Sequence, residues 1–219
     1  MSAKTFATIF RGLEEAFGTY EINSTKANGK QTGQAKIVRE SRTEAHWEGH
    51  LSGKGASVGI IPINADNNCV WGCVDIDQYN FNHKELIDKI REKKLPLVVC
   101  RSKSGGAHVF LFANDWMPAK DMQEVLRHIA SALGYSGSEI FPKQVKLQLD
   151  RGDVGNFLNM PYYDAEDGLR YAIKDDGTAA TLEEFFELHK AYVQTPEQIL
   201  ALQVQKEDNL PVPDGPPCL

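Results

Sequence analysis

The sequence has little cysteine, and its cysteines form no recognisable pattern. The four cysteines among 219 residues are Cys69, Cys73, Cys100 and Cys218, and no second pair stands at metal-ligand spacing. We therefore expect neither a structural zinc site nor a disulfide-stabilised secreted domain, and a reducing, cytoplasmic setting is favoured. Cys69 and Cys73 flank a strongly apolar segment, where they are expected to pack as small buried side chains.

Long apolar runs are also missing. No segment approaches the roughly 20 apolar residues that span a bilayer, and Arg11, Glu14 and Glu15 interrupt the stretch that a signal peptide would need. We therefore expect no contact with a membrane. The net charge of −6 disfavours a general nucleic-acid coat protein, although basic residues outnumber acidic ones between Lys26 and Lys54. A solvated loop and a local phosphate-binding region explain that segment equally well.

The apolar patterns predict a mixed α+β (α/β) fold with a central sheet, flanking N-terminal elements and C-terminal helices. Helices are expected over 3–17, 83–93, 119–133, 181–192 and 196–205, and strands over 57–63, 69–76, 97–100, 108–112, 145–149 and 156–160. The first two strands are expected to be neighbours. The stretch 24–34 is predicted to be a loop or hairpin, and 45–55 to be irregular. From 69 to 160 the element order is typical of a split βαβ arrangement.

Two aspartates end the most apolar of these strands. Residues 70–77 read VWGCVDID, and side chains two apart on a strand point to the same face, so Asp75 and Asp77 are expected side by side. Like charges that close together repel unless a cation lies between them. The pair therefore predicts a divalent metal site, most commonly Mg²⁺ bound together with substrate phosphates. The alternative is a strand that ends at a polar turn.

A glycine-rich loop lies between the next two strands. Residues 101–108 read RSKSGGAH. Adjacent glycines let the backbone approach a ligand, and the hydroxyls of Ser102 and Ser104 can donate to phosphate oxygens. Lys103 adds positive charge, and His108 opens the following strand, where its ring can bond a phosphate. The Walker pattern is absent. A glycine-rich hairpin with a partly exposed histidine explains the same residues.

A further acidic residue, Glu139, opens the run EIFPK after a helix and a glycine-containing turn. A new strand is expected to begin there, so Glu139 is a candidate third carboxylate for the aspartate pair. Lys143, at the end of that run, is a candidate contact for a nucleotide phosphate. A surface acid before a Phe-Pro turn is the alternative. Further on, residues 155–162 read GNFLNMPY and place Asn159 beside apolar neighbours.

Taken in order, these motifs resemble the signatures of the archaeo-eukaryotic primase superfamily, and within it the primase-polymerase domains of phages and mobile elements. The signatures hhhDhD, RSKSGGxH, E-h-F-P-K-Q, HLxGK and G-N-x-h-x-x-P are similar to residues 72–77, 101–108, 139–144, 50–54 and 155–161. Two features depart from the family. Gly106 stands where the tightest form of the second motif has serine, and the zinc-binding insertion of many cellular primases is missing.

The resemblance implies a catalytic core with an RRM-like split βαβ sheet and template-directed nucleotidyl transfer. An NTP or dNTP would be joined to a 3′-hydroxyl, in primer synthesis or DNA extension during replication. The implied catalytic residues are Asp75, Asp77, Glu139 and His108, of which the three acids would hold two divalent ions, Mg²⁺ or Mn²⁺. The implied nucleotide-binding residues are Ser102, Lys103, Ser104, His108, Lys143 and Asn159.

The resemblance also implies partners and a setting. The partners are a single-stranded DNA template with its primer, and a helicase that is either fused or separate. The setting is the cytoplasm of a bacterial host, for a bacterial or phage-encoded protein. Residues 1–193 are expected to form the catalytic domain. Residues 194–219 are expected to form a C-terminal helix and a proline-rich linker that leads to further domains.

Two alternatives use other chemistry. A replication initiator or single-strand-binding module with an inactive site would need no Mg²⁺ or Mn²⁺. A DxD glycosyltransferase would use Asp75 and Asp77 with a metal ion and a nucleotide-sugar, but it gives no reason for the later serine–glycine–histidine loop or for Glu139. Intact acidic and histidine positions argue against a decayed site.

Overall fold

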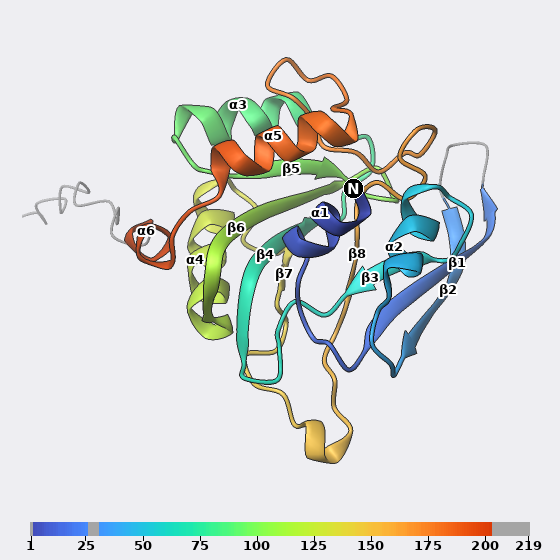
Figure 1. The fold of residues 1–219 in the computed structure, drawn as a ribbon. Helices are drawn as coiled ribbons and strands as arrows, with labels where there is room; N and C mark the ends of the chain where they lie inside the picture. The colour runs from blue at the N-terminus through green and yellow to red at the C-terminus, as the bar shows by residue number, and fades with distance from the viewer. Residues whose placement is uncertain (1, 26–30, 203–219) are drawn as a thin grey trace, which may run out of the picture.

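The computed structural model describes residues 2–25 and 31–202, which form two antiparallel sheets with helices packed around them (Figure 1). One sheet, which we call the β4 sheet, has the order β5-β6-β4-β7, and the other, the β1 sheet, has the order β2-β1-β3-β8. The strands are β1 (Phe17–Thr25), β2 (Gln31–Val38), β3 (Ser57–Ile60), β4 (Asn68–Ile76), β5 (Val98–Arg101), β6 (Ala107–Pro118), β7 (Glu139–Phe141) and β8 (Leu158–Asn159).

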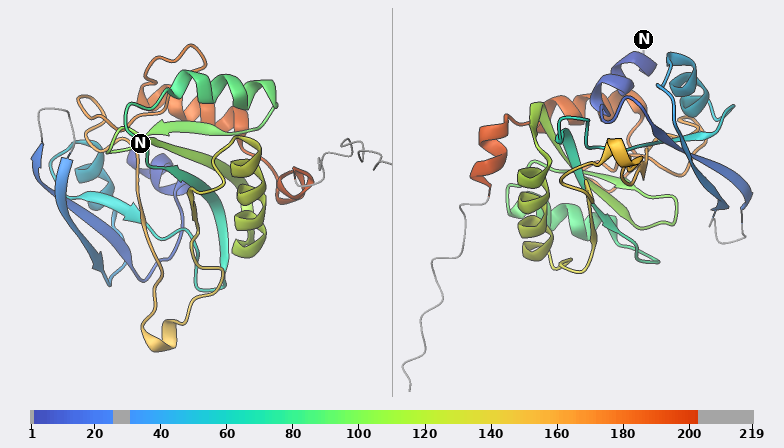
Figure 2. Two further views of the ribbon diagram at one scale, coloured as in Figure 1. Left: turned by 180° about the vertical axis from the view of Figure 1, so that it is seen from behind. Right: turned by 90° about the horizontal axis from the view of Figure 1, so that it is seen from below.

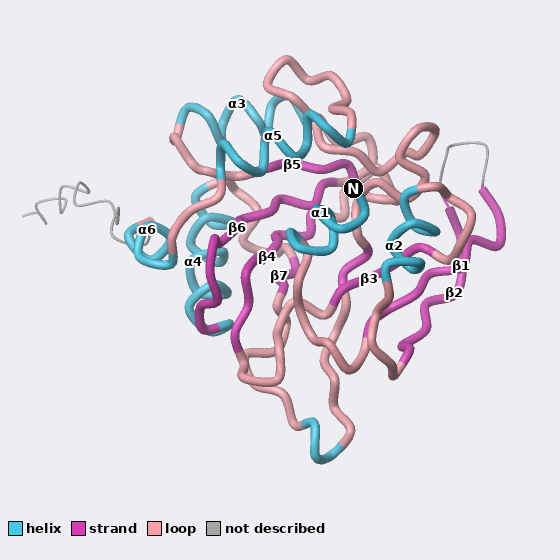
Figure 3. Tube along the Cα trace, viewed as in Figure 1, coloured by secondary structure: helices cyan, strands magenta, loops and turns pink. Residues whose placement is uncertain are grey.

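The helices are α1 (Ser2–Ile9), α2 (Glu44–Leu51), α3 (His83–Glu92), α4 (Ala119–Ala132), α5 (Leu182–Tyr192) and α6 (Pro196–Ala201), with a 3-10 turn, η1 (Leu149–Arg151), before β8. Figure 3 shows that η1 lies at the tip of a long loop that extends away from both sheets. The prediction of a mixed α+β fold is confirmed.

The β4 sheet has the predicted split βαβ arrangement. Its elements follow one another as β4-α3-β5-β6-α4-β7, yet β4 lies between β6 and β7 in space, and every pairing is antiparallel. Figure 2, seen from behind, shows α3 and α4 on the side of this sheet that is turned away in Figure 1. The long-range pairing of β4 with β6 and β7 brings three separate sequence motifs to one sheet end.

The two faces of the β4 sheet bury different side chains, because successive residues of a strand point to opposite faces. Val74 and Val109 pack in a mainly aliphatic cluster with residues of α3 and α4. Cys73 and Phe110 pack on the other face, in an aromatic cluster that includes Phe10 beside α1. Residues that continue the second alternation toward the end of the strands therefore emerge beside an aromatic floor.

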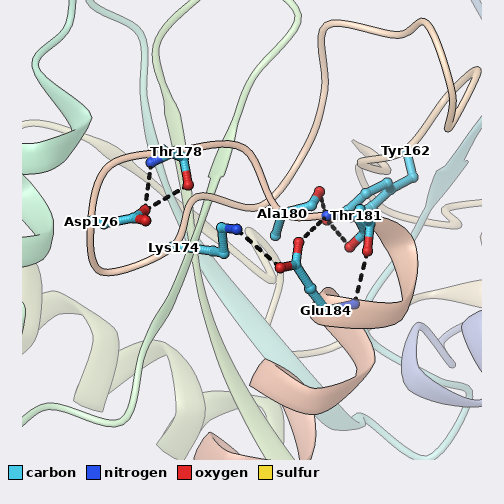
Figure 4. Close-up of polar contacts among 7 residues, drawn as sticks. All are labelled: Tyr162, Lys174, Asp176, Thr178, Ala180, Thr181 and Glu184. Atoms are coloured by element: carbon cyan, nitrogen blue, oxygen red, sulfur yellow. Dashed lines mark hydrogen bonds and ion pairs between the residues drawn. The ribbon is translucent and has the colours of Figure 1, made fainter.

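Helix α5 is fastened to the preceding hairpin by a small polar network (Figure 4). The helix starts with a capping box, in which the Thr181 hydroxyl accepts from the Glu184 N–H and the Glu184 carboxylate accepts from the Thr181 N–H at 2.8 Å. Lys174 pairs with the same carboxylate at 2.9 Å. The buried Tyr162 hydroxyl accepts from the Ala172 N–H at 3.1 Å and faces the Ala180 carbonyl at 3.0 Å. These contacts join the start of α5 to the segments around Tyr162 and Lys174.

The N-terminal helix is shorter than its apolar spacing predicts. Helix α1 ends at Ile9, and Phe17, counted as helical, begins β1. Between them the chain runs against the residue after β3, where the Leu13 N–H donates to the Ile61 carbonyl at 2.9 Å. A Cβ on Gly12 would lie 2.1 Å from the same oxygen, so only glycine allows this approach.

The segment 45–55 was expected to be irregular, and this prediction was wrong, because α2 occupies most of it. The buried residues of α2 are Trp47 and His50, and a histidine on the buried side hides the apolar pattern. The His50 Nδ1 accepts from the Val58 N–H at 2.9 Å, so the proton lies on Nε2, which donates to the Pro161 carbonyl at 2.8 Å. Burial lowers the pKa of His50 to about 3.

Two other predictions need correction. Residues 145–149 form no strand, and the fourth strand of the β4 sheet is the three-residue β7. The strands predicted at 57–63 and 69–76 are not neighbours, since β3 and β4 belong to different sheets. The predicted 24–34 hairpin is present as the paired strands β1 and β2, while its residues 26–30 and the predicted linker from 203 onward lie outside the described residues.

Candidate active site

The strand register places three of the predicted site residues in one row. Asp75 of β4 lies directly opposite His108 of β6 on one side and opposite Glu139 of β7 on the other. Directly opposed residues point to the same face, with Cβ atoms about 4.5–5.5 Å apart. The row continues the aromatic face at the end of the sheet, and Asp77 follows two residues after Asp75. The motifs that contain Asp75, His108 and Glu139 are far apart in the sequence, and they meet at this end of the β4 sheet.

Asp75 lies in an environment that opposes its negative charge. Burial and, after it, the charges of Glu139 and Asp77 raise its pKa to about 6, against the opposing effect of Lys143. Its Oδ1 lies 3.4 Å from the His108 Nε2. Because the two neighbouring acids act on Asp75, the three carboxylates are close enough to repel one another, which is the electrostatic setting of a cation site.

His108 is a neutral ring at physiological pH. Burial and, after it, the positive charges of Arg170 and Lys103 lower its pKa to about 3. The contact with Asp75 is therefore not an ion pair, although the distance would allow one. A neutral imidazole between a carboxylate and two cations can donate one hydrogen bond to an anionic oxygen without adding charge.

The glycine-rich loop holds Asp77 through its hydroxyls. The Ser104 Oγ donates to the Asp77 Oδ1 at 3.0 Å and lies 3.1 Å from the Ser102 Oγ. The loop is closed by the Ser102 N–H, which donates to the Gly106 carbonyl at 2.9 Å. A Cβ at position 106 would lie 2.1 Å from the Ile76 carbonyl. Glycine at this position, a departure from the tightest family motif, is thus required by the approach of the loop to β4.

Glu139 is exposed, whereas Asp75 is largely buried. Its Oε2 pairs with the Lys143 Nζ at 2.7 Å, and the Glu139 side chain is 61% exposed. The Lys143 ammonium also lies 5.1 Å from the centre of the Phe141 ring. A cavity of about 370 Å³ opens between these acids, and Asp75, Asp77 and Glu139 all line it. Lys143 accordingly stands at the edge of the acidic cavity.

Within the described residues, no group of three or more His, Cys, Asp or Glu side chains has converged on a point that would hold a metal ion. The carboxylates of Asp77 and Glu139 are instead turned to Ser104 and Lys143. Their strands nevertheless place them around one cavity, and oxygen donors of this kind suit Mg²⁺ or Mn²⁺. The residues fit divalent ions if the side chains of Asp77 and Glu139 turn inward.

A second group of residues, which carries positive charge, comes partly from the β1 sheet. The Lys103 ammonium lies 3.7 Å from the centre of the Tyr20 ring. The buried Arg170 donates from Nη1 to the Ser57 hydroxyl at 2.6 Å, and Ser57 and Tyr20 are directly opposed in the β1 sheet. Burial lowers the pKa of Arg170 to about 10, so it stays charged at neutral pH. We call Lys103, His108 and Arg170 the anion-facing group.

Arg170 is a candidate site residue that the sequence reasoning missed. It stands in no recognised motif. The segment after β8 pairs with β5, through the Arg101 N–H on the Tyr171 carbonyl and the bridge between Cys100 and Ala172, and this pairing brings Arg170 to the β4 sheet. Arginine is rarely buried to 4% exposure, which makes the position notable.

Asn159 of β8 lies in the β1 sheet, together with Tyr20 and Ser57, which contact Lys103 and Arg170. Asn159 is opposite Gly59, which is two residues from Ser57. Asn159 and Ser57 therefore belong to the same face of the β1 sheet. Within residues 2–25 and 31–202, the Asn159 Oδ1 is buried and has no hydrogen-bond partner. A buried acceptor left without a donor is costly, and a ligand hydroxyl or amino group would remove that cost.

Other motif residues support the fold and not the site. His50 of the HLxGK motif joins α2 to β3 and Pro161 through both ring nitrogens. The Gln144 side chain accepts from the Asn156 N–H at 3.0 Å and so closes the base of the long loop. These motif residues thus hold α2 against the β1 sheet and close the long loop.

A family model described as "TOTE conflict system, Archaeo-Eukaryotic Primase domain" matches residues 4–187. The chain belongs to this family. Its match covers the acidic row, the glycine-rich loop and the anion-facing group together. Primase-type nucleotidyl transfer is the class of function that membership of this primase family indicates. The predicted division at 193 and 194 stays a prediction.

Two solved structures are similar to this primase domain at low identity. One is described as "Crystal structure of primase RepB'", with 13% identity, a TM-score of 0.39 and coverage of 92% of this chain and 63% of that chain. The chain thus spans less than two thirds of that structure. The other is described as "Crystal structure of the catalytic domain of primase Repb' in complex with initiator DNA", with 15% identity, a TM-score of 0.39 and coverage of 94% and 97%.

Among curated proteins, none matches the primase domain. In the part of the chain that the structure describes, no helix has the length and apolar character to cross a membrane.

Proposed function

We propose that this primase domain is a primase-polymerase that joins an NTP or dNTP to a 3′-hydroxyl on a single-stranded DNA template. The observation that carries the proposal is the register that sets Asp75 between His108 and Glu139 at one sheet end. An acidic cavity next to an anion-facing group matches what the reaction needs, namely a place for divalent ions beside a place for a triphosphate.

Asp75, Asp77 and Glu139 would hold two divalent ions, Mg²⁺ or Mn²⁺. When bound, these ions lower the pKa of the attacking hydroxyl and neutralise charge on the triphosphate and the departing pyrophosphate. The contribution of the chain is to position the three carboxylates from two paired strands and the loop after β4. Ser104 holds Asp77 at 3.0 Å, and Lys143 holds Glu139 at 2.7 Å, so both acids have partners that ligand binding would exchange.

The β- and γ-phosphates would lie against the anion-facing group. His108 is neutral and donates one hydrogen bond, while Lys103 and Arg170 supply charge from two directions. Ser102 and Ser104 add hydroxyl donors, and Lys143 reaches the same phosphates once it leaves Glu139. Asn159, whose Oδ1 lacks a donor among the described residues, is placed to accept from the sugar or base of the nucleotide.

The test is an incorporation assay on a single-stranded template, with and without primer. NTP and dNTP are compared, each with Mg²⁺ or Mn²⁺. We expect metal-dependent extension that the Asp75→Ala variant loses by roughly 10³-fold or more, while its melting temperature does not fall much. Asp88→Ala is the matched control, because Asp88 is exposed on α3 and pairs with Lys84.

Full activity in Asp75→Ala would refute the assignment of the carboxylates. A chain that binds the template but incorporates nothing under any metal would identify a binding module with an inactive site. Transfer from a nucleotide-sugar, with no use of the primed template, would identify the glycosyltransferase alternative. A helicase partner, fused or separate, is part of the proposal only as the expected source of single-stranded template.

A further inference from the structure

A second cavity lies beside the acidic one. It has a volume of about 290 Å³, and Tyr79, Phe81, His83, Arg101 and Ser104 line it. Ser104 lines the second cavity, and its Oγ donates to the Oδ1 of Asp77, which lines the acidic one. Of the residues that line the second cavity, Ser104 alone belongs to the proposed metal or triphosphate contacts.

The charge of the second cavity is opposite to that of the first. Three acids line the acidic cavity, whereas the described residues that line the second include Arg101 and no Asp or Glu. The Arg101 Nη1 donates to the Leu169 carbonyl at 2.8 Å, which fixes the guanidinium. No carboxylate within the described ranges pairs with it. A fixed guanidinium with donors to spare suits a phosphate group.

The second cavity also carries aromatic surface. Tyr79 is 64% exposed and stands two residues after Asp77. In the same cavity, the Phe81 ring packs against His83 at 5.1 Å and against Tyr135 at 5.9 Å between ring centres. An exposed aromatic ring in such a cavity is a surface on which unpaired nucleobases stack without regard to sequence.

The walls of this cavity are already joined. The His83 Nε2 lies 2.9 Å from the Gly106 carbonyl, which connects the start of α3 to the glycine-rich loop. The start of α3 is fixed in turn by Asn82, whose side chain accepts from the Glu85 N–H at 3.2 Å. The 79–83 segment and the 101–106 loop are therefore fixed relative to each other, so a ligand would bind in a cavity that is already formed.

We propose that this cavity binds one unpaired nucleotide of a nucleic-acid strand, with its base on the Tyr79 ring and its phosphate at Arg101. The choice of ligand rests on the proposed function. The incoming nucleotide is a less suitable occupant, because the anion-facing group that would hold its triphosphate includes Lys103, which points to Tyr20 of the β1 sheet. The strand nucleotide would thus lie beside Asp77, opposite the triphosphate.

The test measures strand binding apart from catalysis. A short fluorescein-labelled single strand is titrated with the protein in EDTA, without nucleotide, and fluorescence anisotropy gives the Kd. We expect Tyr79→Ala to weaken binding roughly 5- to 150-fold and Tyr79→Phe to stay within about twofold of wild type, since the ring and not the hydroxyl stacks. Arg101→Gln should reduce the slope of log K against log salt by about 1.

Leu200→Ala is the control for loss of an exposed apolar side chain, since Leu200 lies on α6. Binding of a dNTP in Mg²⁺, followed by calorimetry, should be unchanged in Tyr79→Ala. The proposal is overturned if Tyr79→Ala binds the strand like wild type, if Tyr79→Phe weakens as much as Tyr79→Ala, or if only dNTP binding is lost.

The failure of this inference differs from the failure of the proposed function. Metal-dependent incorporation together with normal strand binding by Tyr79→Ala would remove the Tyr79 site and leave the primase-polymerase intact. Absence of incorporation together with weakened strand binding by Tyr79→Ala would remove the catalytic proposal and leave a strand-binding site.

Discussion

Two buried histidines of this primase domain have the same low pKa but different surroundings and roles. Burial lowers the pKa of both His50 and His108 to about 3. The ring of His50 uses both nitrogens on backbone groups of Val58 and Pro161. The ring of His108 instead faces the Asp75 carboxylate and lies in the field of Lys103, while the charge of Arg170 acts on both rings. Burial and pKa alone therefore do not separate a structural histidine from a site histidine.

The difference lies in what each ring satisfies. His50 completes the hydrogen bonds of two backbone groups that would otherwise be buried without partners, so its role is in the stability of the fold. His108 stands where a carboxylate row meets a cationic group, and its Nε2 faces the Asp75 carboxylate and not a backbone group. The comparison predicts that substitutions at the two positions will affect different measurements.

The largest effect on stability is expected for His50→Ala. Its loss leaves the Val58 N–H and the Pro161 carbonyl buried without partners and opens a cavity beside Phe6 and Trp47, so unfolding should become easier by about 2–4 kcal/mol. Chemical denaturation measures the change. His128→Ala, at an exposed position of α4, is the control. A His50 variant as stable as wild type would contradict the structural role.

His108→Ala should lower stability less and affect nucleotide use more. Removal of one hydrogen bond to a charged phosphate oxygen should raise the KM for the incoming nucleotide roughly 10- to 100-fold. Steady-state incorporation at varied dNTP concentration measures it, with the same denaturation experiment run in parallel. An unchanged KM with normal turnover would make His108 a second structural histidine and end the contrast with His50.

A smaller effect is expected in the pH dependence of stability. The folded-state pKa of Asp75, about 6, lies above its ordinary value of 3.8. The folded protein thus holds more protons than the unfolded chain between these values, and its free energy of unfolding should decrease as pH rises through 6. In metal-free buffer, wild type should lose about 1–3 kcal/mol relative to Asp75→Asn between pH 5 and about 7.5.

Denaturation of both proteins at each pH gives this difference directly. Identical pH profiles for wild type and Asp75→Asn would show that burial and the neighbouring acids do not raise the pKa of the Asp75 carboxyl in the folded protein.

The core of the fold could be predicted from sequence where local patterns decide the structure. Helices α3, α4 and α5 follow clear apolar spacing, and Thr181 caps α5 as its position predicts. The pattern failed where tertiary contacts override it. Phe17 lies at helical spacing from Phe6 and Phe10, yet it pairs with Val38 in a strand. The local sequence around Phe17 does not distinguish a helix from a strand.

The site was predictable only in part, for the same reason. Asp75 and Asp77 share a face through the period of a single strand, which sequence shows. The placement of Glu139 opposite Asp75 depends on the pairing of β4 with a strand of three residues, which no local pattern specifies. The approach of Arg170 to His108 depends on how the segment after β8 returns to the β4 sheet. The positions of Glu139 and Arg170 therefore follow from non-local pairings that only the three-dimensional structure shows.

The most direct test of the central claim, that the row around Asp75 holds divalent ions, is a Mn²⁺ titration followed by electron paramagnetic resonance. It is performed with a non-reacting dNTP analogue present, since such ions bind together with substrate phosphates. Wild type should bind Mn²⁺, and Asp75→Asn should bind it at least about tenfold more weakly. Equal Mn²⁺ affinity in the two proteins would contradict the account.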